Sequence, residues 1–482
     1  MTKRSNLLVA LLPVFLLILL LFVNVRYIFG DDSISGANQW ALILAGAFAA
    51  GLAMLVYKTP FTEVTDKIGN NLKETSKAIM ILLLVGALAG TWLISGVIPA
   101  MVFYGLKVLH PSYFLAASLI VCAIVSLATG SSWGTTATVG LALMGIGETM
   151  GMNGAMVAGA VISGAYFGDK LSPMSDTTNL AAVMAGTDLF THIKYMLYTT
   201  VPSISIALIL FIIFGLNSDA STDMASAGAV SDALNEQFNI SLWLLLVPVA
   251  VIVLIAKKVD AIIALLIGVI LGGVFAFIFQ PALIEQVAAG YTESWKQHYY
   301  VFFEFAVRST TIEGNSDVLG GLLEGKGMEG MMSTIWLIIS AMIFGGAMEA
   351  AGFLQRIAEG ILSIATNTAS LIGSTLATCG LLNATASDQY LAIVVPGKMY
   401  KDAYKEKGLA PENLSRSLED GGTVTSVLIP WNTCGAYQSA TLGIATGEYW
   451  MYCFFNIISP FMSLIYAIFG IKIRKLETQN QA

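Results

Sequence analysis

The sequence predicts an all-α polytopic membrane protein, and three observations support this fold class. Of the 482 residues, 56% are hydrophobic and only 11% are charged, whereas a soluble domain carries about 25% charged residues. The mean hydropathy is +0.77. Apolar runs approaching the roughly 20 residues that cross a bilayer recur along the whole chain.

The apolar runs are of two kinds. Uninterrupted runs predict full spans at 7–29, 40–57, 78–97, 195–216, 239–256, 260–279, 333–352 and 449–470. Four other apolar segments are interrupted by glycines and polar residues: 113–148, 154–190, 361–397 and 418–447. We interpret the first and third of these as re-entrant hairpins and the other two as broken spans.

This order of segments predicts an inverted repeat. Residues 1–216 contain three spans, a hairpin, a broken span and a final span, and residues 239–470 repeat that order from the opposite side of the membrane. Such repeats are typical of secondary transporters. Residues 217–238 then form an external connecting loop, and 471–482 form a cytoplasmic tail. Sequence similarity between the halves is faint, so the alternative is a coincidence in how the segments are divided.

The basic residues predict the orientation. With both termini in the cytoplasm, most of the lysines and arginines lie inside, as the positive-inside rule requires. The expected location is therefore the cell inner (cytoplasmic) membrane, with many passes and with lipid as the surrounding partner. Nothing in the sequence predicts binding to nucleic acid, and a homodimer stays open.

Several signals argue against an enzyme. "GSSWG" at 130–134 fits a Gly-x-Ser-x-Gly motif, but that motif has meaning only on a strand–turn–helix elbow with histidine and aspartate partners. The four cysteines form no CxxC pair, and the three histidines lie far apart. No phosphate-binding GxxxxGK[ST] motif is present. We therefore expect no cofactor and transport driven by ion gradients.

Four polar islands interrupt the broken segments, and they are the candidate site. They are "ATGSSWGTT" (128–136), "GDKLSPMSDTTN" (168–179), "NATASDQ" (383–389) and "LEDGGTVTSVLIPWNTCG" (418–435). Irregular backbone at membrane depth must be satisfied by protein or water, and carbonyl, hydroxyl and carboxylate oxygens suit a small cation. The candidate ion- or substrate-binding residues are Ser131, Ser132, Thr135, Asp169, Lys170, Ser175, Asp176, Thr177, Thr178, Asn179, Thr385, Asp388, Glu419, Asp420, Thr423, Trp431, Asn432 and Thr433.

Structural roles compete with this interpretation. Ser175 or Asp176 could simply cap a helix after Pro173, although an aspartate at membrane depth is costly and is by default functional. Hydroxyl groups also join helices to one another. Glu419 and Asp420 could lie nearer the cytoplasmic surface.

"SSWGTTATVG", "GAYFGDKLSPMSDTTNLA", "TASDQYLAIVVPGKMY" and "NLSRSLEDGGTVTSVLIPWNTCGA" together resemble the NhaC family of sodium/proton antiporters. The resemblance runs over nearly the whole chain. It implies exchange of Na⁺ for H⁺ by alternating access. The family also includes Na⁺-coupled exchangers of small organic anions such as malate and lactate, so that alternative, or an exchange of amino acids, stays open.

For the antiport mechanism we expect a carboxylate at membrane depth that binds either Na⁺ or H⁺. The predicted Na⁺ ligands are Asp176, Thr177, Thr178 and Asn432, with Asn179 beside them. Asp169 is either a second ligand or the partner of Lys170, and Lys170 is an alternative proton carrier. Thr385, Asp388 and Thr433 complete the site, and Trp431 would line it for an organic substrate.

Overall fold

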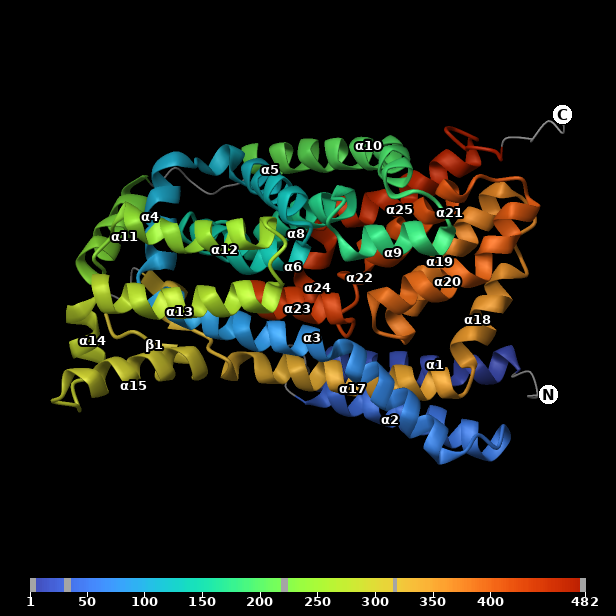
Figure 1. Ribbon diagram of the computed structural model, residues 1–482, viewed down its shortest axis with the longest axis horizontal. Helices are drawn as coiled ribbons and strands as arrows, with labels where there is room; N and C mark the ends of the chain where they lie inside the picture. The colour runs from blue at the N-terminus through green and yellow to red at the C-terminus, as the bar shows by residue number, and fades with distance from the viewer. Residues whose placement is uncertain (1–5, 30–35, 218–223, 315–318, 477–482) are drawn as a thin grey trace.

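The computed structural model describes residues 6–29, 36–217, 224–314 and 319–476. It is an elongated bundle of helices that run mostly along its long axis (Figure 1). The first helix and the end of the last one lie at the same end of the bundle, which we call the terminal end. Parts of the predicted connecting loop (218–223) and of the predicted tail (477–482) lie outside the described residues.

The described residues up to 217 are mostly helical. Its elements are α1 (Leu7–Val23), the π-helical turn η1 (Asn24–Ile28), α2 (Ala37–Val56), α3 (Phe61–Ile94), α4 (Val97–Val108), α5 (Pro111–Thr129), α6 (Ser132–Thr135), the π-helical turn η3 (Thr136–Gly140), α7 (Leu141–Thr149), α8 (Gly154–Leu171), α9 (Asp176–Ala185) and α10 (Leu189–Leu216).

The second part adds one small β-hairpin to further helices. Its elements are α11 (Met224–Gln237), η4 (Leu242–Leu245), α12 (Leu246–Ala256), α13 (Ala261–Phe279), α14 (Pro281–Val287), α15 (Ser294–Val307), β1 (Thr310–Thr311), η5 (Gly320–Leu323), β2 (Glu324–Gly325), η6 (Glu329–Met331), α17 (Met332–Ala350), α18 (Phe353–Leu362), α19 (Thr368–Thr385), α20 (Gln389–Glu406), α21 (Pro411–Leu418), the π-helical turn η7 (Glu419–Thr423), α22 (Val424–Ser426), α23 (Thr433–Leu442), α24 (Thr446–Tyr449), η8 (Trp450–Tyr452) and α25 (Phe454–Ile468). The strands pair antiparallel, with Thr310 opposite Gly325.

The all-α polytopic prediction is confirmed. Within the described residues, seven helices are long and apolar enough to cross a membrane, and two bent helix pairs bring the number to as many as nine. One bent pair joins Gly228–Gln237 to Leu242–Ala256, and the other joins Thr446–Tyr452 to Phe454–Ile468. The inverted order of the two halves stays a prediction.

The helices break at the four polar islands. Gly130, with φ +69°, ends α5, and a Cβ there would lie 2.7 Å from the Met174 carbonyl carbon. The other breaks fall between α8 and α9, between α19 and α20 at Ser387 (φ 61°), and between α22 and α23. After each break a new helix begins inside the bundle.

Close helix packing positions the second island. Gly164 and Gly168 of α8 face α5, where added Cβ atoms would lie 2.2 Å from the Leu119 carbonyl oxygen and 2.4 Å from the Leu127 nitrogen. Small residues four apart allow backbones to approach in this way. The last turn of α8, which carries Asp169 and Lys170, is therefore fixed against α5.

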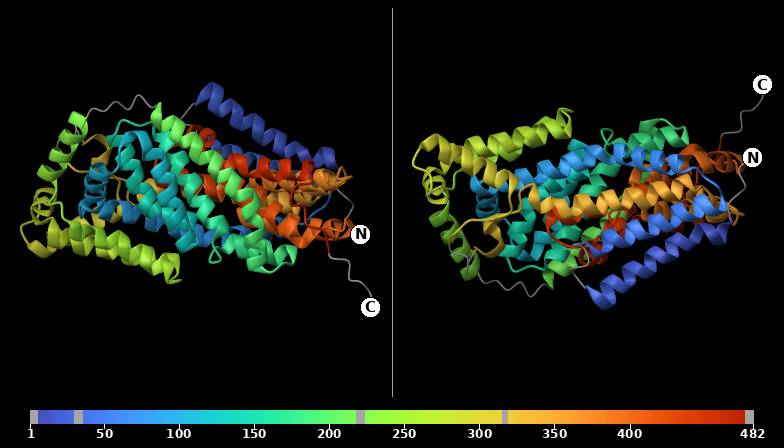
Figure 2. Two further views of the ribbon diagram at one scale, coloured as in Figure 1. Left: turned by 90° about the horizontal axis from the view of Figure 1, so that it is seen from above. Right: turned by 90° about the horizontal axis from the view of Figure 1, so that it is seen from below.

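Three features differ from the sequence expectation. The span expected at 78–97 is the second half of the longer helix α3, which begins at Phe61 because helix-forming polar residues precede the apolar run. The expected connecting loop contains helix α11. The chain between α13 and α17 builds α14, α15 and the β-hairpin at the end of the bundle opposite the terminal end (Figures 1 and 2), a region for which no element was predicted.

Candidate functional site

All four polar islands meet at one cavity of about 340 Å³. The residues that line it come from the four islands and from α3 and the start of α13: Glu74, Thr75, Lys77, Ala78, Ile81, Gly130, Ser131, Ser132, Trp133, Asp169, Ser175, Asp176, Thr177, Ala261, Asp388, Gln389, Tyr390 and Thr433. The cavity thus brings together predicted site residues that are up to about 300 positions apart in the chain.

Asp169 is one of the two buried carboxylates that line this cavity, the other being Asp388. It lies on the last turn of α8 with only 8% of its surface exposed. Its Oδ2 accepts hydrogen bonds from the Ser132 backbone N–H at 3.2 Å and from the Ser132 hydroxyl at 2.7 Å. Hydrogen bonds to a carboxylate are strongest when it is ionised, and the Ser175 hydroxyl is a further hydrogen-bonding neighbour of the Asp169 side chain.

Asp176, the residue with the strongest sequence prediction, also lines the cavity but is exposed. It is the first residue of α9, where a negative charge is favourable. Ser175 caps that helix by accepting from the Thr178 N–H, and its hydroxyl contacts the Thr177 hydroxyl at 3.1 Å. Asp176 therefore lies in the solvent-accessible part of the cavity, and Asp169 lies deeper.

The third and fourth islands close another wall. Asp388 caps α20 by accepting from the N–H groups of Tyr390 and Leu391 at 2.8 and 3.0 Å. Thr433 begins α23, and its N–H donates to the Ser387 carbonyl at 3.0 Å. Asn432 caps α23 and donates to Asn383 at 3.0 Å. Asn432 is completely buried and lies behind the lining, whereas Asp388 and Thr433 face the cavity.

Lys170, Glu419 and Asp420 form a second, fully buried cluster rather than part of the lining. The Lys170 ammonium is paired with Asp420 and also donates to the Ser459 hydroxyl at 3.0 Å. The Ser463 hydroxyl donates to the other Asp420 oxygen at 2.5 Å. This pair joins α8, η7 and α25 in the interior.

The other predicted residues satisfy the backbone around the breaks. The Thr178 hydroxyl donates to the Asp169 and Lys170 carbonyls at 3.2 and 3.0 Å, and Asn179 donates to the Pro173 carbonyl at 3.0 Å. Thr135 and Thr385 donate to the Ser131 and Leu381 carbonyls one turn earlier in the chain, and the Trp431 indole N–H donates to the Ala384 carbonyl of α19, 47 positions away. Thr423 ends η7 with a buried hydroxyl.

Several lining residues were not predicted from the sequence. Glu74 and Lys77 lie one turn apart on α3, and the polar run "NNLKETSK" before the apolar half of that helix was the available signal. Trp133 stacks on Tyr437 with ring centroids 4.0 Å apart, so the helices that begin at the first and fourth islands touch directly. Tyr390 follows Asp388 on α20.

The lining is strongly acidic. It contains Glu74, Asp169, Asp176 and Asp388, and its one basic residue is Lys77. Lys77 pairs with Asp260 at 3.0 Å. That hydrogen bond holds the pKa of Asp260 below its ordinary value.

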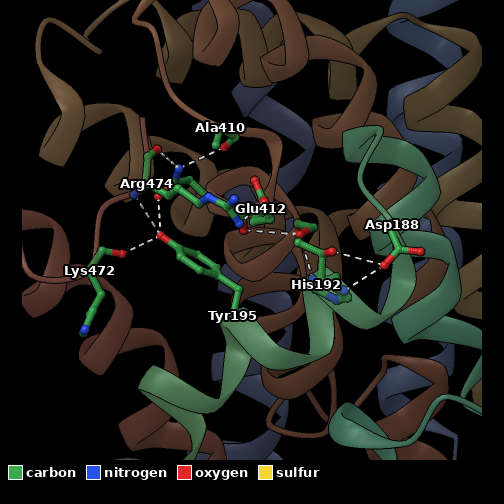
Figure 3. A network of polar contacts seen from close by, with 10 residues as sticks. Asp188, His192, Tyr195, Ala410, Glu412, Lys472 and Arg474 are labelled. Carbon is green, nitrogen blue, oxygen red and sulfur yellow. Dashed lines mark hydrogen bonds and ion pairs between the residues drawn. The ribbon is translucent and has the colours of Figure 1, made fainter. Parts of the chain in front are cut away.

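A second polar network joins α10 to α21 and to the segment after α25 (Figure 3), and none of its labelled residues lines the cavity. The Tyr195 hydroxyl of α10 contacts Asn413 Oδ1 at 2.6 Å and the Lys472 carbonyl at 2.5 Å. Arg474 pairs with Glu412 at 2.9 Å, and the Ser415 hydroxyl contacts His192 Nδ1 at 2.7 Å. The segment after α25 is thereby fixed to α10 and α21.

Broken helices that enclose a polar cavity within a bundle of spanning helices define the class of secondary transporters. Comparison with known families agrees, because residues 164–471 match the model of the Na⁺/H⁺ antiporter family. The chain belongs to this family, whose members are transporters and not enzymes.

Three relatives illustrate the range of activities among similar proteins. The Na⁺/H⁺ antiporter NhaC of Alkalihalophilus pseudofirmus is 35% identical over 91% of this chain and 90% of its own. The malate-2H⁺/Na⁺-lactate antiporter of Bacillus subtilis is 35% identical over 85% of each chain. The arginine/ornithine antiporter ArcD of Halobacterium salinarum is 32% identical over 98% of this chain and 93% of its own.

Proposed function

We propose that this protein exchanges Na⁺ for H⁺ across the cytoplasmic membrane, and that both ions use the acidic cavity. The observation that carries the proposal is the charge of the lining. Four carboxylates face the cavity, and the single ammonium is already paired with Asp260. Hard oxygen donors from carboxylates and hydroxyls suit a small cation.

Asp169 is the proposed centre of the Na⁺ site. Ser132 fixes its carboxylate, and the hydroxyls of Ser175 and Thr177 lie in the same lining. Asp176 and Asp388 add negative charge that draws cations into the cavity. We retain Asp176 and Thr177 as proposed ligands, while Thr178 and Asn432 support the broken backbone from behind.

The same charge pattern argues against an organic anion as the substrate. Four helices begin at this cavity, and their N-termini would favour a carboxylate ligand. Asp176 and Asp388, however, already occupy two of these N-termini. Trp431 is turned toward the Ala384 carbonyl and is not part of the lining. A malate or lactate molecule would therefore meet repulsion without an unpaired basic side chain from the lining.

The test is transport by purified protein in proteoliposomes. A Na⁺ gradient should drive proton movement in the opposite direction, detected with an internal pH-sensitive dye, and adding malate, lactate or arginine should not be required. Asp169→Asn should abolish the signal while the protein still inserts and elutes as a folded species. Proton movement that needs one of the organic compounds would overturn the proposal.

A further inference from the structure

Glu419 is a buried carboxyl group that the Na⁺ site does not use. It is the first residue of η7 and is 0% exposed. In the described structure neither Oε1 nor Oε2 makes a hydrogen bond of normal geometry, and the nearest hydrogen-bonding neighbour is the buried Thr423 hydroxyl one turn along η7. An ionised carboxylate in such surroundings carries a desolvation cost of several kcal/mol, which the Thr423 hydroxyl and the more distant Lys170 charge offset only in part. Complete burial therefore favours the neutral, protonated form in this conformation.

The charged groups around Glu419 come from few elements. Asp169 and Lys170 of α8, the adjacent Asp420 and Cys379 of α19 lie within electrostatic range of it. The Lys170 ammonium is hydrogen-bonded to Asp420 and Ser459, so its charge acts on Glu419 only through space.

Other titratable groups on the packed elements contact other residues. The buried Tyr404 hydroxyl of α20 contacts the Ser417 hydroxyl at 3.3 Å and the Thr375 hydroxyl at 3.0 Å. The Arg416 guanidinium of α21 stacks over the Tyr195 ring, with 4.7 Å to the centroid. The Tyr400 hydroxyl of α20 contacts Thr378 at 2.7 Å, and Asp176 of α9 lines the cavity.

Charge balance links this group to the cavity. Asp169, Glu419 and Asp420 together with Lys170 would carry a net charge of −2 if all were ionised. One proton on Glu419 reduces this to −1. One Na⁺ at Asp169 with Glu419 ionised also gives −1. The interior thus has the same charge with either ion, which suits an exchange in which one ion replaces the other.

We propose that Glu419 carries the exchanged proton and releases it when Na⁺ binds at Asp169. This inference rests on the proposed Na⁺/H⁺ exchange and adds the proton-carrying residue. In this step the O–H bond of the Glu419 carboxyl breaks and its electron pair stays on the carboxylate. The proton then moves past Asp169 to water in the cavity. The positive charge of Na⁺ nearby favours the ionised carboxylate.

The experiment compares Glu419→Gln with wild type, because glutamine imitates the shape of the protonated carboxyl. Equilibrium binding of radioactive Na⁺ to purified protein should show that the wild-type affinity depends on pH and that the variant still binds Na⁺ with an affinity independent of pH. In proteoliposomes the variant should exchange Na⁺ for Na⁺ and move no protons. Infrared difference spectra with and without Na⁺ should lose the band of a protonated carboxyl in the variant.

Glu412→Gln is the matched control, since Glu412 lies two turns earlier in the same helical segment and pairs with Arg474; it should keep wild-type coupling. Glu419→Asp keeps a carboxyl group at this position and should still move protons. Comparing it with Glu419→Gln therefore distinguishes loss of the proton-carrying group from misfolding. The inference is overturned if Glu419→Gln moves protons with the wild-type pH profile. Absence of Na⁺-driven proton movement in wild type would instead contradict the proposed function itself.

Discussion

Ser132 donates two hydrogen bonds to one oxygen of Asp169, from its backbone N–H and from its hydroxyl. The two residues are 37 positions apart and belong to different broken segments. The contact therefore connects the helix that begins at the first island to the helix that ends at the second. Any movement of one segment against the other changes the surroundings of this buried carboxylate.

Ser132→Ala should weaken Na⁺ binding without abolishing it. The variant loses the hydroxyl donor, whose hydrogen bond to a charged group is worth about 1.5–3 kcal/mol, but keeps the backbone donor. The dissociation constant for Na⁺, measured by equilibrium binding, should rise about tenfold or more, since tenfold corresponds to about 1.4 kcal/mol. Thr138→Val on the same helical segment, where the hydroxyl donates to the Gly134 carbonyl, should leave the constant unchanged.

Lys170→Met should destabilise the protein strongly. It leaves Asp420 fully buried without its counter-ion, a change that costs about 3–5 kcal/mol for buried pairs. Thermal unfolding in detergent should show a clear drop in the midpoint. The double variant Lys170→Met/Asp420→Leu should recover much of the loss, because both charges are then removed. Equal stability of wild type and Lys170→Met would contradict a structural role for the pair.

Tyr195→Phe should loosen the segment after α25. The hydroxyl contacts Asn413 and the Lys472 carbonyl, and it accepts from the Arg474 N–H at 3.3 Å (Figure 3). Removing it leaves buried polar atoms unpaired, at about 1–3 kcal/mol. Amide hydrogen exchange at 471–476 should become faster. Tyr198→Phe, one turn along α10, is the control and should leave that exchange rate unchanged.

The predicted orientation can be tested by labelling with an impermeant thiol reagent. The four native cysteines are buried, so background labelling should be low. Single cysteines would replace Lys405, which follows the hairpin predicted at 361–397, and Met150, which lies between the segments predicted at 113–148 and 154–190. We expect Lys405 on the cytoplasmic side and Met150 on the external side, so the two cysteines should react from opposite sides of the membrane. Reaction from the same side would contradict the inverted repeat.

The sequence predicted the spans and the breaks, because both follow from local composition. Long apolar runs form helices in lipid, and glycine and hydroxyl residues within them mark where the helix cannot continue. Gly130 is an example, since its left-handed backbone and its contact with Met174 exclude a side chain. The NhaC resemblance predicted the family, and the family match confirms it.

What the sequence could not predict depends on tertiary packing. Asp169 and Asp176 lie seven residues apart in one island, and only the break between α8 and α9 places one deep and the other in the exposed part of the cavity. Glu74 and Lys77 belong to a helix whose sequence pattern predicts only an ordinary span with a polar extension. They reach the cavity because α3 packs beside α13 and the fourth island.

The most direct test of the account is the affinity for Na⁺ as a function of pH. If one cavity exchanges one Na⁺ for one H⁺, the apparent dissociation constant of wild-type protein should rise about tenfold for each pH unit below the pKa of the proton-carrying group. Above that pKa it should level off, because no proton is left to displace. The range from about pH 5 to 9 covers the values plausible for a perturbed carboxyl group. An affinity that stays constant over this whole range would contradict competition between Na⁺ and H⁺ in this protein.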